Sequence, residues 1–177
     1  MITGHFDRSY ITAFKGHAPL IDPSVFVDIS TRLIGRVTLA SGVTVWPGAV
    51  LRADDEEIRV GKGSAKLDMS LLEAPAGRPV VVEPGALVSH MACLHGAVVK
   101  TGALVGIGAI VLDAAVVGAG SLVGAGTLVP PGMEAPSGVL VLGQPAKVIR
   151  ELKPVERETV NRQLADLRAK AAIYSRG

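Results

Sequence analysis

Two histidines and a glutamate are the residues of this sequence best suited to hold a metal ion. His90 and His95 are separated by four residues in the segment SHMACLHG, and Glu73 precedes them in the segment LLEAP. Two imidazoles and one carboxylate form a known ligand set of catalytic zinc and of non-haem iron, with a further position open for water. Such an ion lowers the pKa of its water and supplies hydroxide near neutral pH. The same residues have a simpler interpretation, in which Glu73 pairs with Arg52 and both histidines are polar surface residues.

A repeat of six residues determines where these side chains stand. Aliphatic residues recur at every sixth position over most of the chain, and small residues follow four places later. The clearest run is Val99, Val105, Val111, Val117, Val123 and Val129. Neither the period of an α-helix nor that of a single strand explains this register, whereas six is the period of a parallel β-helix. The sequence therefore predicts a mainly β fold in which three hexads close a triangular coil of about eighteen residues.

Stacking of the coils places equivalent residues in columns, about 4.8 Å apart. One inward column contains a leucine from each of three coils: Leu51, Leu72 and Leu94. The residues after these leucines form an outward column on the same face: Arg52, Glu73 and His95. His90 belongs to the preceding hexad and to another face, roughly 16 Å along the strand from His95. One chain cannot bring His90 and His95 to a shared ion, whereas two subunits packed side by side can.

The hexad register is interrupted three times between residues 51 and 99. Three residues are inserted in the acidic run 54–57, four are inserted near 74–79, and the step from Leu94 to Val99 is one residue short. Insertions on a solenoid form surface loops that often mark the functional face. The same register places Lys66 at an inward position, which is unusual for a charged side chain.

Composition excludes several classes of protein. Charged residues make up 19% of the 177 residues and balance to +2, so nothing favours a nucleic acid or an anionic membrane as a partner. The apolar stretch 102–120 is long enough to span a bilayer, but its glycines and Asp113 favour coils of the β-helix instead. One cysteine, Cys93, and the lack of an apolar leader predict a reducing compartment and a cytoplasmic protein. His5 and His17 lie outside the register and are interpreted as non-functional.

The chain divides into three predicted segments. Residues 1–20 form an N-terminal arm, residues 21–150 the hexapeptide-repeat β-helix, and residues 151–177 a C-terminal α-helix. Pro154 and Glu156 suit the first turn of that helix. Its apolar stripe has spacings of four, three and four residues: Val160, Leu164, Leu167 and Ala171.

The chain resembles the gamma-class carbonic anhydrase family over about residues 11–175. The resemblance is carried by four motifs in the same order: VWPGAVLRADDEEIRVG, SHMACLHG, GALVGIGAIVLDAAVVGAGSLVGAGTLV and LGQPAKVIREL. It implies a homotrimer of left-handed β-helices, each with a C-terminal α-helix, and a metal ion at each subunit interface. It also implies that His90 and His95 are metal ligands on neighbouring subunits. Arg52 and Asp54 match residues that link subunits and orient bicarbonate.

The sequence departs from the family at the metal and in the pocket. Glu73 stands at the place of the first metal histidine, so the implied metal ligands are Glu73, His90 and His95. Ala65 and Leu67 replace the Asn and Gln of an N-x-Q-D run, in which Asp68 is retained. A tyrosine usual on the C-terminal helix aligns with Arg168. The implied catalytic residues are Arg52, Asp54 and Asp68, and the expected metal is zinc, with iron or cobalt as alternatives.

Three functions agree with these observations. The first is hydration of CO2 to bicarbonate by a metal-bound hydroxide, with activity that is weak or lost. The second is a non-catalytic trimer that serves as a scaffold or binds a ligand. The third is acyl transfer from coenzyme A, because hexapeptide acyltransferases share an ending similar to the segment GQPAKVIR. Those enzymes carry a catalytic histidine on an extended loop, and neither inserted loop here contains one, so acyl transfer ranks last. No nucleic-acid or membrane partner is expected.

Overall fold

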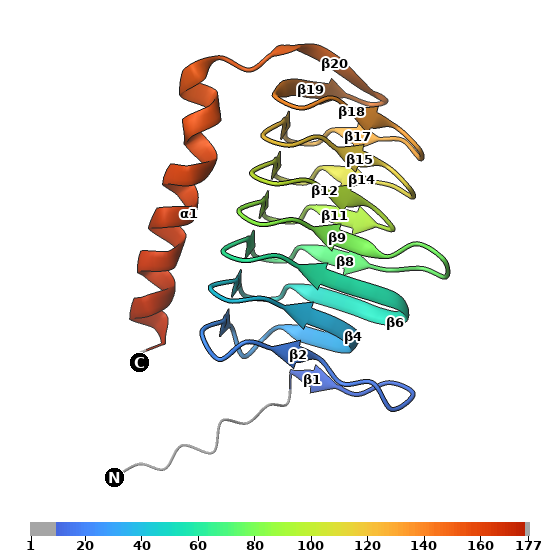
Figure 1. Ribbon diagram of the computed structural model, residues 1–177, viewed down its shortest axis with the longest axis vertical. Coiled ribbons are helices and arrows are strands. Elements are labelled where there is room, and N and C mark those ends of the chain that lie inside the picture. Colours follow the sequence, from blue (N-terminus) through green and yellow to red (C-terminus); the bar gives the residue numbers. More distant parts are fainter. Residues whose placement is uncertain (1–9, 176–177) are drawn as a thin grey trace.

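The six-residue spacing of aliphatic side chains produces short strands separated by turns, and the strands of successive coils stack in parallel. The computed structural model describes residues 10–175, and these form a parallel β-helix followed by one C-terminal α-helix (Figure 1). The mainly β fold predicted from the repeat is therefore confirmed. Residues 1–9 of the predicted arm, with His5, and residues 176–177 lie outside the described residues.

One side of the β-helix is a sheet of eight strands, in the order β20-β19-β16-β13-β10-β7-β5-β3. All neighbours in it are parallel except β19 and β20, which pair antiparallel at the C-terminal end. Its strands are β3 (Phe26–Val27), β5 (Thr44–Val45), β7 (Ala65–Lys66), β10 (Leu87–Val88), β13 (Leu104–Val105), β16 (Leu122–Val123), β19 (Val139–Gly143) and β20 (Ala146–Glu151).

The other two sides form a continuous sheet of twelve strands, because two long strands run across the corner between them. The long strands are β4 (Arg32–Leu39) and β6 (Val50–Val60). Five short strands stack on one side: β1 (Ile11–Thr12), β8 (Leu71–Glu73), β11 (Cys93–His95), β14 (Ile110–Val111) and β17 (Leu128–Val129). Five others stack on the second side: β2 (Leu20–Ile21), β9 (Val80–Val82), β12 (Val98–Val99), β15 (Val116–Val117) and β18 (Glu134–Ala135).

Strand pairing reproduces the predicted columns. Leu72 of β8 pairs with Leu51 on one side and with Leu94 on the other, and Glu73 likewise lies between Arg52 and His95. The inward leucines and valines are fully buried and form one apolar core along the axis of the coil. Counting hexads was therefore sufficient to establish which side chains are neighbours between coils.

The interruptions of the register also lie where the spacing predicted them. Ala53 pairs with Gly35 and Ile58 with Val37, so residues 54–57 of β6 lie opposite Arg36 alone. Three residues are thus extra, and they bulge out of the long strand pair. Residues 74–79 form a loop between β8 and β9. This loop and the bulged region project from the side of the coil away from the helix (Figure 1).

Lys66 occupies the interior of the coil. It pairs with Val45 below and Val88 above, in a column that otherwise consists of valines. Its side chain is fully buried, and its Nζ donates a hydrogen bond of 3.2 Å to the carbonyl oxygen of Ala65. Burial lowers the pKa of Lys66 to about 7, because the charged ammonium loses its hydration in the apolar core.

The C-terminal helix α1 (Pro154–Tyr174) packs along the outside of the eight-stranded sheet, running from the last coil back toward the first (Figure 1). Its predicted stripe faces the sheet, since Val160, Leu164 and Ala171 are buried and Leu167 is partly buried. Glu156 accepts a hydrogen bond of 2.7 Å from the backbone N–H of Lys153 and so caps the first turn. Phe26, Trp46 and Tyr174 form an aromatic cluster at the other end of the helix, with ring centroids 5.3 to 6.0 Å apart.

The apolar stretch 102–120 forms β13, β14 and β15 with their turns, as the repeat predicted. Over the described part of the chain, no helix has the length and apolar character needed to cross a membrane.

Candidate functional site

A ladder of ionisable side chains runs across the coils on the face formed by β6, β8, β11 and β14. Arg52 forms a hydrogen-bonded ion pair with Glu73, and Glu73 lies beside His95. His95 in turn contacts Asp113, which follows β14. Each rung comes from the next coil, so the spacing of the coils fixes the spacing of the side chains. The structure therefore brings together Arg52, Glu73 and His95, as the column predicted, and adds Asp113.

Arg52 connects this ladder to the bulge of β6. Its Nε lies 3.8 Å from an oxygen of Asp54, and the bond to Glu73 raises the pKa of Arg52 further above its ordinary value. The pairing of Arg52 with Glu73 is the simpler interpretation that the sequence left open. The guanidinium thus competes with any cation for the carboxylate of Glu73.

His95 has its two ring nitrogens turned toward different carboxylates. Its Nδ1 lies 3.1 Å from Oδ2 of Asp113, whereas its Nε2 lies 3.9 Å from Oε1 of Glu73. The first distance is that of a hydrogen bond and the second is too long for one. All three side chains are partly exposed, between 24% and 34%. The Nε2 of His95 and the carboxylate of Glu73 therefore face each other across a gap that solvent can reach.

His90 lies on another corner of the coil, in the turn after β10, and pairs with Asp68. Its Nδ1 is 2.9 Å from Oδ2 of Asp68, which stands one coil earlier in the turn after β7. Both side chains are more than 40% exposed. The predicted separation of His90 from His95 is thus reflected in the sheets, because β10 and β11 belong to different ones.

The six predicted site residues form two groups rather than one. Arg52, Asp54, Glu73 and His95 lie together on one face, while Asp68 and His90 lie on the neighbouring corner. Within residues 10–175, no three side chains of His, Cys, Asp or Glu converge in the way that a metal ion requires. The described part of a single chain therefore does not assemble the predicted set of Glu73, His90 and His95.

Sequence reasoning missed Asp113, and the column rule does not reach it. Leu94 pairs with Val111, a step of 17 residues instead of 18, so the column of His95 continues to Leu112. Asp113 stands one residue beyond that column and reaches His95 through its side chain.

Ala65 and Leu67 are covered by the helix. They flank Lys66 on the outside of β7 and are only 1% and 5% exposed, in the apolar cluster that also contains Val160 and Leu164. A glutamine at position 67 would be buried beneath α1 in this chain.

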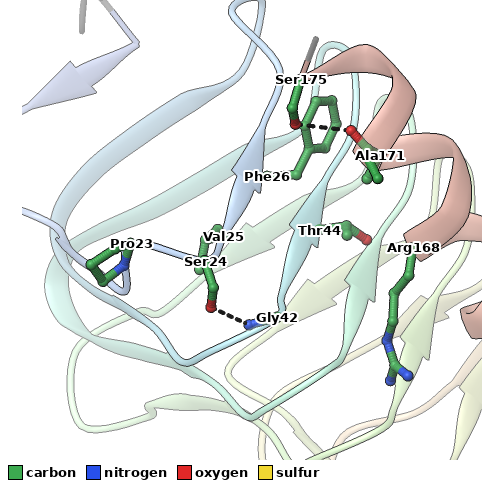
Figure 2. Close-up of a pocket in the computed structure, with 10 residues that line it drawn as sticks. Pro23, Ser24, Val25, Phe26, Gly42, Thr44, Arg168, Ala171 and Ser175 are labelled. Carbon is green, nitrogen blue, oxygen red and sulfur yellow. Dashed lines mark hydrogen bonds between the residues drawn. The ribbon is translucent and has the colours of Figure 1, made fainter.

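Arg168, at the position aligned with a helix tyrosine, points into a groove between the last turns of α1 and the first coils (Figure 2). The groove has a volume of about 270 Å³ and is lined by Ser24, Gly42 and Ser175 among others. Arg168 donates a hydrogen bond of 3.1 Å to the carbonyl oxygen of Gly63. The lining of the groove includes none of the six predicted site residues, all of which lie in the described part of the chain.

Cys93 is partly buried, and His17 lies in a short N-terminal turn. Burial, with a smaller contribution from Glu73, raises the pKa of the Cys93 thiol and makes it less able to form a thiolate. His17 exchanges backbone hydrogen bonds with Phe14 in a short N-terminal turn.

Two relatives that cover most of this chain carry different names. It is 44% identical over 164 residues to the uncharacterized transferase YtoA of Bacillus subtilis, covering 93% of this chain and 96% of that protein. It is 39% identical over 142 residues to a carbonic anhydrase of Geobacillus kaustophilus, covering 80% of this chain and 78% of the relative.

Two solved structures superpose on nearly the whole of this chain. A putative acetyltransferase from Bacillus cereus superposes with a TM-score of 0.91 at 32% identity, covering 93% of this chain and 95% of that one. A hexapeptide transferase family protein from Anaplasma phagocytophilum gives the same TM-score at 30% identity, covering 94% and 99%. A scan against protein-family models found no match.

Proposed function

The chain belongs to the gamma carbonic anhydrase and hexapeptide-transferase family, and from this premise we propose that it is a cytoplasmic homotrimer that binds a metal ion between subunits and hydrates CO2 weakly. Glu73 and His95 of one subunit and His90 of the next would hold the ion, with zinc as the expected metal and iron or cobalt as alternatives. When bound, the ion would supply hydroxide near neutral pH for attack on CO2.

The observation that carries this proposal is the pairing of both histidines with carboxylates. Nδ1 of His90 lies against Asp68 and Nδ1 of His95 lies against Asp113. Histidines that ligate metals in proteins almost always donate their second ring N–H to a carboxylate, a backbone carbonyl or water, which leaves the other nitrogen free as a ligand. The same arrangement on both histidines, built from different coils, favours metal binding over two unrelated surface pairs.

The donor groups of one chain suit part of such a site. Oε1 of Glu73 and Nε2 of His95 face each other at 3.9 Å, and both would turn their lone pairs toward an ion between them. An oxygen and an imidazole nitrogen are ligands that zinc, iron and cobalt all accept. A third ligand has to come from outside this face, since His90 stands on another corner.

The corner that carries His90 has the character of a subunit contact. Met69 and Met91 lie beside Asp68 and His90 and are 65% and 60% exposed, and Ile107 on the next coil is 48% exposed. Both methionines have positive φ angles, 59° and 56°, which bulky residues rarely adopt. Exposed apolar side chains on a strained turn support a surface that a second copy of the chain covers.

Arg52 and Asp54 have a supporting role in the proposal. Arg52 is 44% exposed and lies next to Glu73, so its guanidinium can orient a bicarbonate or CO2 oxygen at the edge of the site. Its bond to Glu73 also weakens that carboxylate as a metal ligand. Weak hydration activity follows from this competition.

The proposal predicts that metal binding can be restored by mixing two inactive variants. His90→Ala and His95→Ala should each form trimers that bind no zinc. In trimers co-expressed from equal amounts of both, about one quarter of the interfaces pair an intact His90 with an intact His95, because each interface uses one residue from each neighbour. We therefore expect zinc content and CO2 hydration at about one quarter of the wild-type values. Zinc is measured by mass spectrometry and hydration by stopped flow.

Two results would contradict the proposal. A monomeric wild type in light scattering would remove the interface on which the site depends. Binding of metal by wild type but not by the mixture would show that the two histidines serve the same subunit. His90→Ala alone, expressed and purified in the same way as the mixture, provides the matched control.

Acyl transfer is the second candidate, because two of the similar proteins are named as a transferase and a putative acetyltransferase. We expect no turnover of acetyl coenzyme A with amine or hydroxyl acceptors, since neither inserted loop supplies a histidine as general base. The release of free thiol is the measurement, with a buffer blank as reference. Turnover that His90→Ala or His95→Ala abolishes would rank acyl transfer above CO2 hydration.

A further inference from the structure

Asp113 is an acidic residue that neither the family resemblance nor the predicted ligand set includes, yet it makes the shortest contact of His95. Its Oδ2 lies 3.1 Å from Nδ1 of His95. Its other oxygen, Oδ1, lies 3.9 Å from Nε of Arg78, which stands in the loop between β8 and β9. The two oxygens of Asp113 thus have separate partners, and the carboxylate is held from two sides.

Glycine at position 96 leaves the space that this arrangement needs. Gly96 has a φ of 56°, and a Cβ there would lie 2.8 Å from Cβ of Arg78 and 3.1 Å from Oδ1 of Asp113. A Cβ at this position would force Arg78 to shift and would crowd the carboxylate of Asp113. The short step of five residues between Leu94 and Val99 also falls here, so the chain turns tightly just beneath Asp113.

A neutral histidine carries its proton on only one of its two nitrogens, and the hydrogen bond of one nitrogen sets the state of the other. A carboxylate only accepts, so Asp113 requires a hydrogen on Nδ1. A neutral His95 then presents a lone pair at Nε2. That lone pair faces Oε1 of Glu73, which is also an acceptor, at 3.9 Å. Two acceptors that face each other leave room for a donor or a cation between them, and a cation there would compete with Arg52, which donates to the same oxygen of Glu73.

We propose that Asp113 is a positioning residue that holds His95 in the tautomer protonated at Nδ1, with Nε2 directed as a metal ligand toward Glu73. The inference rests on the proposed function, because it gives Asp113 a task in the proposed metal site. Asp113 reaches the ion only through His95 and does not itself ligate it. Asp68 contacts Nδ1 of His90 in the same way, on the side of the proposed site that the neighbouring subunit supplies.

The competing arrangement is a purely electrostatic one. A doubly protonated His95 between Asp113 and Glu73 would complete a ladder of alternating charges with Arg52. In that case Nε2 carries a hydrogen and offers no lone pair, and the role of Asp113 is structural. The two arrangements differ in the protonation of the ring, which can be observed directly.

The first test is the tautomer of His95 in the metal-free protein. Long-range ¹H–¹⁵N spectra of protein labelled at histidine distinguish the two neutral tautomers and the imidazolium, and His95→Gln assigns the signals. At pH 8.5 we expect the Nδ1–H tautomer in the wild type and in Asp113→Asn, whose side-chain oxygen also accepts a hydrogen bond. Asp113→Ala should show a mixture of both tautomers. An imidazolium or an Nε2–H tautomer in the wild type would overturn the proposal.

The second test is metal affinity. Loss of such a carboxylate typically weakens metal binding by about 10- to 100-fold, so we expect Asp113→Ala to lower zinc affinity by this factor and Asp113→Asn by less. Asp166→Ala, an exposed acidic residue on α1, is the matched control and should bind like wild type. Zinc binding and tautomer both unchanged in Asp113→Ala would refute the role of Asp113 while leaving the proposed function intact. If Asp113→Ala changes the tautomer of His95 but the wild type binds no metal, the role of Asp113 in holding the tautomer stands and the proposed function is refuted.

Discussion

Replacing Lys66 with methionine should raise the free energy of unfolding by about 4 kcal/mol at pH 7. Lys66 is fully buried in a column of valines, and burial lowers its pKa from 10.5 to about 7. The unfolded chain carries the ordinary pKa, so folding at neutral pH requires the ammonium either to lose its hydration or to release its proton. Methionine has similar length and volume and carries no charge, so it removes this cost without leaving a cavity.

The difference between the two proteins should shrink as the pH rises. Between pH 7 and 10.5 the unfolded wild type binds more protons at this lysine than the folded one, so wild-type stability increases with pH. Near pH 9.5 the advantage of Lys66→Met should fall to about 1 kcal/mol, and below about pH 6, where Lys66 is protonated in both states, it should stop changing. Denaturant unfolding at pH 7 and pH 9.5, followed by circular dichroism, measures both values.

Lys170→Met provides the control, because Lys170 is exposed on α1 and the same substitution there buries nothing. It should alter stability by less than about 0.5 kcal/mol at either pH. A Lys66→Met protein that is no more stable than wild type would show that the ammonium retains a polar environment in the coil. A gain that does not depend on pH would attribute the effect to packing instead of charge.

Replacing Glu73 with histidine should increase zinc affinity and CO2 hydration by at least about tenfold. Glu73 brings a negative charge to the proposed site, which reduces the net charge of the centre and the acidity of water there. It is also bonded to Arg52. Imidazole has neither property, because it is neutral as a ligand and does not pair with a guanidinium. Isothermal titration with zinc and stopped-flow hydration measure the two effects.

Folding should survive this change. The pair between Arg52 and Glu73 is partly exposed, and pairs of this kind contribute about 0 to 1 kcal/mol. Glu57→His is the matched control, since Glu57 also pairs with an arginine of β6 but stands outside the predicted site. The double variant with Glu73→His and His90→Ala should lose the gain, because the neighbouring subunit then has no ligand to offer.

Two outcomes would redirect the interpretation of Glu73. A wild type that hydrates CO2 rapidly, and a slower Glu73→His, would mean that the carboxylate has a direct role in the reaction. If neither protein retains metal, the family's site has been lost in this chain and the non-catalytic trimer becomes the better description.

The sequence by itself determined the coil and the neighbours within it. The hexad spacing predicted that Glu73 lies between Arg52 and His95, that three residues bulge out at 54–57, and that Lys66 points inward. These features depend only on counting along the chain, because each hexad adds one side to the coil and hydrogen bonding between coils keeps the register. The same counting takes the column of His95 to Leu112, so it does not find Asp113.

The tertiary structure decided everything that depends on where side chains and the helix come to rest. Counting along the coil left open whether Arg52 or a metal engages Glu73, which carboxylate each histidine nitrogen faces, and whether Ala65 and Leu67 line a pocket or lie beneath α1. Register fixes which backbone positions are adjacent, but the direction of a long polar side chain follows from competition among several partners within reach. The docking of α1 likewise depends on an apolar surface assembled from strands far apart in the sequence, which no local spacing contains.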